Sequence, residues 1–180
     1  DILARVLESG DYSRAAVTPT SSPSMDIQVS SNFERLLFDL HGRDSAALSA
    51  AMAGFEATGR MAIPAPLLKE ARARFAAERV DTAEMAETIR WALDHAGQLI
   101  DPHTAIGLAA ARRLEGAIEG PIVTLATAHP AKFPAAVEAA SGVWPMLPPR
   151  VAPIMDRPER CARLPADLVA LEAFVDSLPA

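Results

Sequence analysis

The sequence predicts a mostly helical α/β protein with one clear strand, at about residues 121–126, that belongs to a larger sheet. Apolar residues recur at helical spacing along most of the chain, between capping residues and glycines. Residues 122–126 instead form a short, apolar and largely β-branched run after Gly120-Pro121, which is typical of a buried strand. The sequence offers no strands to pair with both edges of this one, so we expect its neighbours to come from outside these residues.

Before the strand, the helices are predicted from their caps and apolar stripes. Each begins near a Ser, Asn, Asp or Pro, and most end at a Gly. The predicted helices cover residues 2–9, 31–41, 44–58, 66–75, 82–96 and 102–115. A weaker strand is predicted at 15–18, and the hydroxyl- and proline-rich residues 18–24 are predicted to form a loop.

After the strand, Pro130 is predicted to begin a helix that carries Phe133 and Val137 on one face and ends at Ser141-Gly142. Residues 145–158 are rich in proline and are expected to wrap over a surface, and a last helix is expected at 165–177. We therefore treat residues 1–180 as one portion of a protein, in which residues 145–180 are a proline-rich surface segment followed by the final helix.

Composition excludes several classes of function. The net charge is −6 and no basic run is longer than Arg112-Arg113, which argues against a nucleic-acid partner. No stretch approaches the roughly 20 apolar residues of a membrane helix. The single cysteine, Cys161, cannot form an internal disulfide, so we expect a reducing, cytoplasmic location. The chain opens at Asp1, without Met and within a helical pattern, so we expect it to be cut from a longer protein.

The turn after the strand, Thr127-Ala128-His129, holds the first candidate site residues. Ligands of open α/β sheets bind at the carboxyl ends of strands, where this turn would place a hydroxyl and an imidazole. His103, in the first turn of a predicted helix, suits a site or a surface position equally. His41 and His95 lie at helix ends, where a structural role is favoured. Since no two histidines have i, i+4 spacing, no metal site is predicted.

Other chemistry receives weaker support. There is no Gly-rich phosphate loop and no nucleophile-elbow serine. Lys132 has the chemistry of a Schiff-base or anion-binding lysine, but a surface lysine on the first helical turn is the preferred interpretation. Arg35 either holds an anion or pairs with Glu34 across the helix surface.

Several short blocks, in order and in register, resemble the carboxyl-terminal portion of threonine synthase. The resemblance covers nearly the whole chain. The blocks are Asp-Ile-Leu-Ala-Arg at 1–5, Ser-Pro-Ser-Met-Asp-Ile at 22–27, Ser-Asn-Phe-Glu-Arg at 31–35, Asp-Pro-His-Thr-Ala at 101–105 and Thr-Ala-His-Pro-Ala-Lys-Phe at 127–133.

This resemblance implies a pyridoxal 5'-phosphate enzyme of the tryptophan-synthase-like fold (fold type II). The reaction implied is the conversion of O-phospho-L-homoserine and water to L-threonine and phosphate, in threonine biosynthesis. In the family, a lysine and a Gly-rich loop of the amino-terminal half hold the cofactor's aldehyde and phosphate. Neither is present here, and Lys132 does not match that lysine. We therefore expect the missing amino-terminal half as a partner and no activity from these residues alone.

The resemblance also implies roles for individual residues. Thr127 matches the hydroxyl that meets the cofactor's pyridine nitrogen, and a neutral hydroxyl there favours an unprotonated ring. His129 and the turn Asp101-Pro102-His103-Thr104 are expected near the cofactor or as braces of its walls. The residues expected beside the substrate pocket are Ser24, Asp26, Ser31, Asn32 and Arg35. No catalytic residue and no metal ligand is assigned in this chain.

Two alternatives stay open at this point. One is another type II enzyme that acts on an amino acid, such as a threonine or serine dehydratase. Its product, a keto acid, distinguishes it from an enzyme that releases phosphate from O-phospho-L-homoserine. The other is a helical binding module without chemistry, which would be a stable monomer indifferent to the cofactor.

Overall fold

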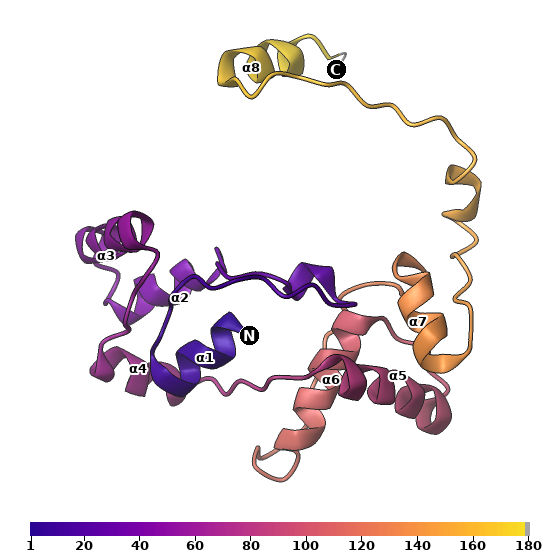
Figure 1. Cartoon of the computed structure of the whole chain (residues 1–180), viewed down its shortest axis with the longest axis horizontal. Coiled ribbons are helices and arrows are strands. Elements are labelled where there is room, and N and C mark those ends of the chain that lie inside the picture. The colour runs from indigo at the N-terminus through magenta and orange to yellow at the C-terminus, as the bar shows by residue number, and fades with distance from the viewer. Residues whose placement is uncertain (179–180) are drawn as a thin grey trace. The chain divides into compact units, whose positions relative to one another are not determined.

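The computed structural model describes residues 1–178, which form eight α-helices and three short 3₁₀ turns (Figure 1). The α-helices are α1 (Ile2–Ser9), α2 (Phe33–Leu40), α3 (Ser45–Thr58), α4 (Ala65–Arg72), α5 (Thr82–Ala96), α6 (Pro102–Leu114), α7 (Pro134–Ser141) and α8 (Leu168–Asp176). The 3₁₀ turns are η1 (Pro23–Met25), η2 (Pro130–Lys132) and η3 (Ala152–Ile154). The mostly helical character predicted from the sequence is confirmed.

The helix boundaries follow from local capping chemistry. The carboxylates of Asp44, Asp81 and Asp101 accept backbone N–H groups in the first turns of α3, α5 and α6. Gly59 and Gly97 end α3 and α5 with φ of 69° and 63°, a left-handed conformation that glycine adopts without a steric penalty. These signals lie in the sequence next to the helices that they bound, which is why the boundaries were predictable.

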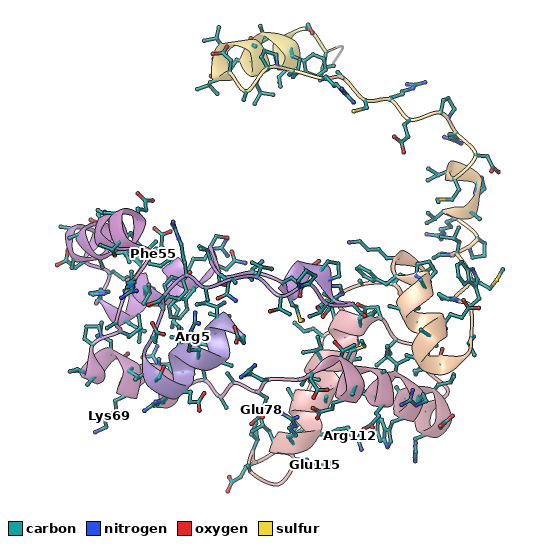
Figure 2. The ribbon with its side chains drawn as sticks, viewed as in Figure 1. Arg5, Phe55, Lys69, Glu78, Arg112 and Glu115 are labelled. Carbon is teal, nitrogen blue, oxygen red and sulfur yellow. The ribbon has the colours of Figure 1, made fainter. Side chains whose placement is uncertain are left out.

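A first hydrophobic core joins α1, α2, α3 and α4. Its centre is Tyr12, whose ring centroid lies 5.1 Å from that of Phe33 and 4.8 Å from that of Phe55, labelled in Figure 2. The Tyr12 hydroxyl accepts the N–H of Ser30 at 2.9 Å, so its polar end is satisfied. Arg72 ties α4 to the end of α1 by donating to the carbonyl oxygen of Leu7 at 2.6 Å.

A second hydrophobic core lies where α5 packs against α6 and α7 (Figure 1). It is built on Met85, Ile89, Ala105 and Ala140, of which Ile89 and Ala105 are fully buried. At its edge, Arg113 of α6 hydrogen-bonds to Glu78 and Glu84, and the bond to Glu78 raises the pKa of the Arg113 guanidinium. This core packs the start of α6 against α5, next to the polar residues that open α6.

The predicted strand at 121–126 does not form in this structure. These residues carry no strand hydrogen bonds, and Val123 and Leu125 are 80% and 73% exposed. Within residues 1–178 the β-pairing consists of two isolated bridges, one joining Asp11 to Ala62 and one joining Glu115 to Ile118. An apolar run cannot become a strand without a neighbour for its amides, and the weaker strand predicted at 15–18 fails for the same reason.

Three helices differ clearly from the prediction in their limits. Helix α4 ends at Arg72, whereas its end was predicted at Phe75. The helix expected from Pro130 is divided into η2 and α7 at Phe133, because the residue before Pro134 is pushed out of the helical region and has φ −130° and ψ 54°. The last helix, α8, begins at Leu168, where the carboxylate of Asp167 accepts the N–H of Ala170 at 2.9 Å.

Residues from Leu147 onward form a second compact unit. Through residue 178 this unit contains η3 and α8, and none of its described side chains is buried. Large apolar side chains stand open, among them Met155, Leu168 and Val169, which are 66%, 67% and 71% exposed. Among the described residues, no helix is both long enough and apolar enough to cross a membrane.

Candidate functional site

Asp101, the N-cap of α6, is the centre of a buried hydrogen-bond network. Its carboxylate is fully buried and has Pro102 after it at the first helical position. Oδ1 accepts the backbone N–H of His103 at 2.9 Å and the His103 Nδ1–H at 3.0 Å. Oδ2 accepts the hydroxyl of Thr104 and, at 3.4 Å, its backbone N–H. Both oxygens act only as acceptors, as those of an ionised carboxylate do.

The His103 imidazole is held as a neutral group with one tautomer. Its Nε2 accepts the backbone N–H of Ser24 at 3.3 Å, so this nitrogen carries no proton. The ring proton is therefore on Nδ1, which donates it to Asp101. The ring is only 6% exposed, and its centroid lies 4.6 Å from that of Phe133. His103 thus links α6 to the loop that contains Ser24.

Thr104 makes the corresponding link to the turn at Thr127. Its hydroxyl donates to Asp101, and the same oxygen accepts the backbone N–H of Thr127 at 3.2 Å. One turn further along α6, a Cβ atom at Gly107 would lie 3.6 Å from the Thr124 methyl group, so helix and segment are in contact there. Thr127 itself is exposed, and its hydroxyl makes no hydrogen bond within residues 1–178.

His129 follows two residues later and caps η2. Its Nδ1 accepts the backbone N–H of Ala131 at 3.1 Å, as the side chain of an N-cap residue does. In the neutral ring the proton is then on Nε2. The residue is exposed, so this N–H is available to a ligand.

The loop before α2 is closed by Asp26. Its two carboxylate oxygens accept the N–H and the hydroxyl of Thr20, each at 2.7 Å. Thr20 in turn lies 3.1 Å from the hydroxyl of Ser22, which is buried. These bonds shape the loop so that the N–H of Ser24, not its hydroxyl, meets His103.

The structure therefore brings together four of the predicted site residues, Ser24, Asp101, His103 and Thr127, with Asp26 and His129 in the same two loops. It does not bring Asn32 and Arg35 to them, since no hydrogen bond or ion pair among the described residues joins either to this network. Arg35 lies on α2 and lines an open cleft of about 460 Å³, together with Ser31, Glu34, Phe38, Asp39, Arg43 and Leu48.

Sequence reasoning placed Thr104 only within the turn 101–104 that was expected to brace the cofactor's walls, and it gave the Phe133 ring no role in the site. The signal for Thr104 was available, because a hydroxyl three residues after an Asp-Pro cap is placed to bond to the capping carboxylate. For Phe133 no local signal exists, because its contact with His103 spans two separate elements.

Chemically, this arrangement binds and orients. It offers the exposed hydroxyls of Ser24 and Thr127, which make no hydrogen bond within residues 1–178, and the exposed imidazole of His129. The backbone of Thr127 is linked through Thr104 to the buried carboxylate of Asp101. The nearest lysine, Lys132, has its ammonium 5.6 Å from the centroid of the Phe133 ring and stays on the surface. In residues 1–178, no three side chains of His, Cys, Asp or Glu gather into a metal-binding group.

Comparison with known proteins gives one consistent family. Residues 104–175 match the family model described as "Threonine synthase, C-terminal". The chain is 46% identical, over 97% of its length, to the threonine synthase of Pseudomonas aeruginosa, of which it spans 38%.

Solved structures agree with this match. The PLP-bound threonine synthase from Brucella melitensis matches 97% of this chain with a TM-score of 0.84 and 48% identity, and the chain covers 38% of it. Yeast threonine synthase matches 98% of the chain with a TM-score of 0.80 and 30% identity, and the chain covers 40% of it. By sequence and by fold, this chain belongs to the threonine synthase family, in which it corresponds to the carboxyl-terminal portion.

Proposed function

We propose that this chain forms the carboxyl-terminal portion of a cytoplasmic threonine synthase. With an upstream half, it would use pyridoxal 5'-phosphate to convert O-phospho-L-homoserine and water to L-threonine and phosphate, a lyase reaction of threonine biosynthesis. The observation that carries the proposal is the turn at Thr127. It presents a free hydroxyl on a fixed backbone, in a chain 48% identical to a PLP-bound threonine synthase.

The residues of this turn fit the cofactor. A pyridine nitrogen is an acceptor, and the Thr127 hydroxyl is a neutral donor that has no partner within residues 1–178. When bound, the cofactor supplies an electron sink for the bonds around the substrate's amino-bearing carbon. Thr127 would bind the ring at its nitrogen without adding a negative charge there. This would favour the unprotonated ring, which withdraws electrons less strongly than a protonated ring does.

The neighbouring residues would build the walls of the same site. Asp101 and His103 would support it as two buried groups that are hydrogen-bonded to each other and to the Ser24 loop. His129 offers its exposed Nε2–H, and the loop of Ser24 and Asp26 forms one side of the substrate pocket. Asn32 and Arg35, exposed at the start of α2, would offer an amide and a guanidinium to the anionic substrate.

The upstream half would complete the fold as well as the site. Successive strand residues point to opposite faces, which would place Val123 and Leu125 on one face and Ile122 and Ala126 on the other. All four are exposed, so apolar surface is open on both sides of residues 121–126. Strands of a sheet covered on both faces have this pattern. We therefore propose that residues 121–126 form a strand of a larger sheet whose other strands lie upstream, with the lysine and the phosphate loop. The open apolar side chains of α8 would be covered in the same way.

Product analysis tests this function on the complete enzyme, meaning this chain with its upstream half. The protein is incubated with O-phospho-L-homoserine, and in parallel with threonine and with serine, in the presence of the cofactor. Phosphate and threonine from the first substrate support the proposal. A 2-oxo acid from threonine or serine, without phosphate release, would identify a dehydratase-type enzyme instead. No product and no retained cofactor would point to a non-catalytic helical binding module.

A further inference from the structure

We propose that Thr104 is a positioning residue of the site. It couples the backbone of Thr127 to the buried Asp101, and so determines where the hydroxyl of Thr127 lies. This inference rests on the proposed function for its catalytic consequence, but the coupling itself is a property of this chain. Thr104 does not touch the cofactor or the substrate in this account.

Within residues 1–178 the Thr127 turn has little else to hold it, and in the proposed sheet it would lie beyond the last strand residue, 126. Residues 121–128 make no backbone–backbone hydrogen bond to any part of the chain that the structure describes. Leu125, Ala126 and Thr127 are all exposed. The bond of 3.2 Å from the Thr127 N–H to Thr104 Oγ1 therefore connects an exposed turn to the helical scaffold.

The other end of this connection is buried and fully hydrogen-bonded. Asp101 is fully buried, and its two oxygens accept four hydrogen bonds at the start of α6. Thr104 is itself only 6% exposed and lies on the helix that the second core holds. A shift of the Thr104 hydroxyl would break its bond to a buried carboxylate, which is costly.

Position 104 needs a group that donates to Asp101 and accepts from Thr127 through one atom, and a hydroxyl does both. The β-branched side chain of threonine also restricts the first side-chain torsion angle within a helix, which limits the directions in which the oxygen can point. Valine has the same shape without the oxygen, and serine has the oxygen without the branch.

These differences define the test in the complete enzyme. Thr104→Val removes the link, Thr104→Ser keeps it, and Thr88→Val is the matched control. Thr88 is a threonine that is 2% exposed, and its hydroxyl bonds to the Glu84 carbonyl oxygen at 2.8 Å, inside α5 and away from the site. All three proteins are compared with the wild type by hydrogen–deuterium exchange of residues 121–128, by cofactor affinity, and by kcat and KM.

We expect faster exchange at the Thr127 amide in Thr104→Val, cofactor binding weakened about tenfold, and a fall in kcat of about tenfold with KM little changed. We expect Thr104→Ser and Thr88→Val to exchange like the wild type and to retain most cofactor affinity. Wild-type exchange and wild-type cofactor affinity in Thr104→Val would overturn the proposal, as would equal losses in Thr88→Val.

If Thr104→Val does not fold, a second variant at the same position still tests the proposal. Thr104→Cys places a thiol of similar size, which is a weak donor and a weak acceptor. It should show the same faster exchange to a smaller degree, and exchange equal to the wild type in a folded Thr104→Cys protein would again overturn the proposal. If the wild type neither binds the cofactor nor releases phosphate, the proposed function fails, and the exchange data still decide whether Thr104 holds Thr127.

Discussion

His103 Nε2 accepts the backbone N–H of Ser24 at 3.3 Å, across 79 positions of sequence. The contact joins the start of α6 to a loop that precedes α2, and it fixes which ring nitrogen carries the proton. Together with the bond from Thr104 to Thr127, it means that one helix terminus holds two separate loops of the candidate site.

This contact predicts the tautomer of His103. In the folded protein, ¹⁵N spectra of the imidazole should show a neutral ring protonated at Nδ1, because Nε2 is occupied as an acceptor. His103→Phe keeps a ring beside Phe133 but removes both hydrogen bonds, so amide exchange in residues 20–26 should rise. A ring protonated at Nε2, or unchanged exchange in His103→Phe, would contradict the contact.

A second prediction compares two aspartates that cap helices in the same way. Asp101→Asn places an NH₂ group among buried donors and should lower the free energy of unfolding by about 3 kcal/mol. Asp44→Asn, at the exposed N-cap of α3, should change it by no more than about 0.5 kcal/mol, since Asn caps as well as Asp. Urea unfolding of the two variants measures both values. Similar values would show that the burial of Asp101 adds nothing to its role as a cap.

Thr127 should matter for turnover more than for stability. Its side chain is exposed and its hydroxyl unpaired within residues 1–178, so Thr127→Val should change the free energy of unfolding by no more than about 0.5 kcal/mol. The same variant should lower kcat of the complete enzyme about tenfold or more, which corresponds to one hydrogen bond to the cofactor. Thr127→Ser is the control and should keep most of the activity. An unchanged rate and unchanged cofactor spectrum in Thr127→Val would remove this residue from the site.

His129 has a structural role and a proposed binding role, and two variants separate them. Asparagine is a good N-cap, so His129→Asn should keep the bond to the Ala131 N–H and the stability of the turn. His129→Ala should lower the free energy of unfolding by about 1 kcal/mol. Both variants lose the exposed Nε2–H, so steady-state kinetics should show a similar fall in kcat/KM for both. Full activity of His129→Asn would mean that His129 acts only as a cap.

The exposed residues of 121–126 provide a prediction about assembly. Leu125→Asp should prevent the complete enzyme from accumulating as folded, cofactor-containing protein, because a charge would replace an apolar side chain inside the proposed sheet. Leu125→Ile, which keeps the apolar surface and suits a strand, should assemble normally. The ratio of bound cofactor to purified soluble protein is the measurement. Normal assembly of Leu125→Asp would show that this segment stays open to solvent.

The helices were predictable because their signals are local. Asp101-Pro102 marks the start of α6 and Gly97 the end of α5, each within a residue of the boundary, and Pro134 explains the division at Phe133 once its effect on the preceding residue is considered. Residues 121–126 show the limit of such reasoning. Their pattern identified an apolar segment, but strand formation depends on hydrogen-bond partners that residues 1–178 do not supply.

The sequence predicted which residues belong to the candidate site, but not which hydrogen bonds join them. The short blocks pointed to the turns at 101–105 and 127–133, whereas the bond from Thr104 to Thr127 spans 23 positions and that from Ser24 to His103 spans 79. No periodicity or cap encodes which atoms of two distant turns meet. The resemblance alone also does not place a side chain. Arg35 belongs to one of the same blocks, yet it lines the open cleft beside Phe38 and Leu48 and has no bond to the Asp101 network within residues 1–178.

The structure of the complete enzyme with pyridoxal 5'-phosphate bound would test the central claim most directly. We predict that the Thr127 hydroxyl lies within about 3.2 Å of the cofactor's ring nitrogen, with the Thr127 N–H still bonded to Thr104. A cofactor bound away from this turn, or a ring nitrogen that meets a carboxylate instead of Thr127, would contradict the account.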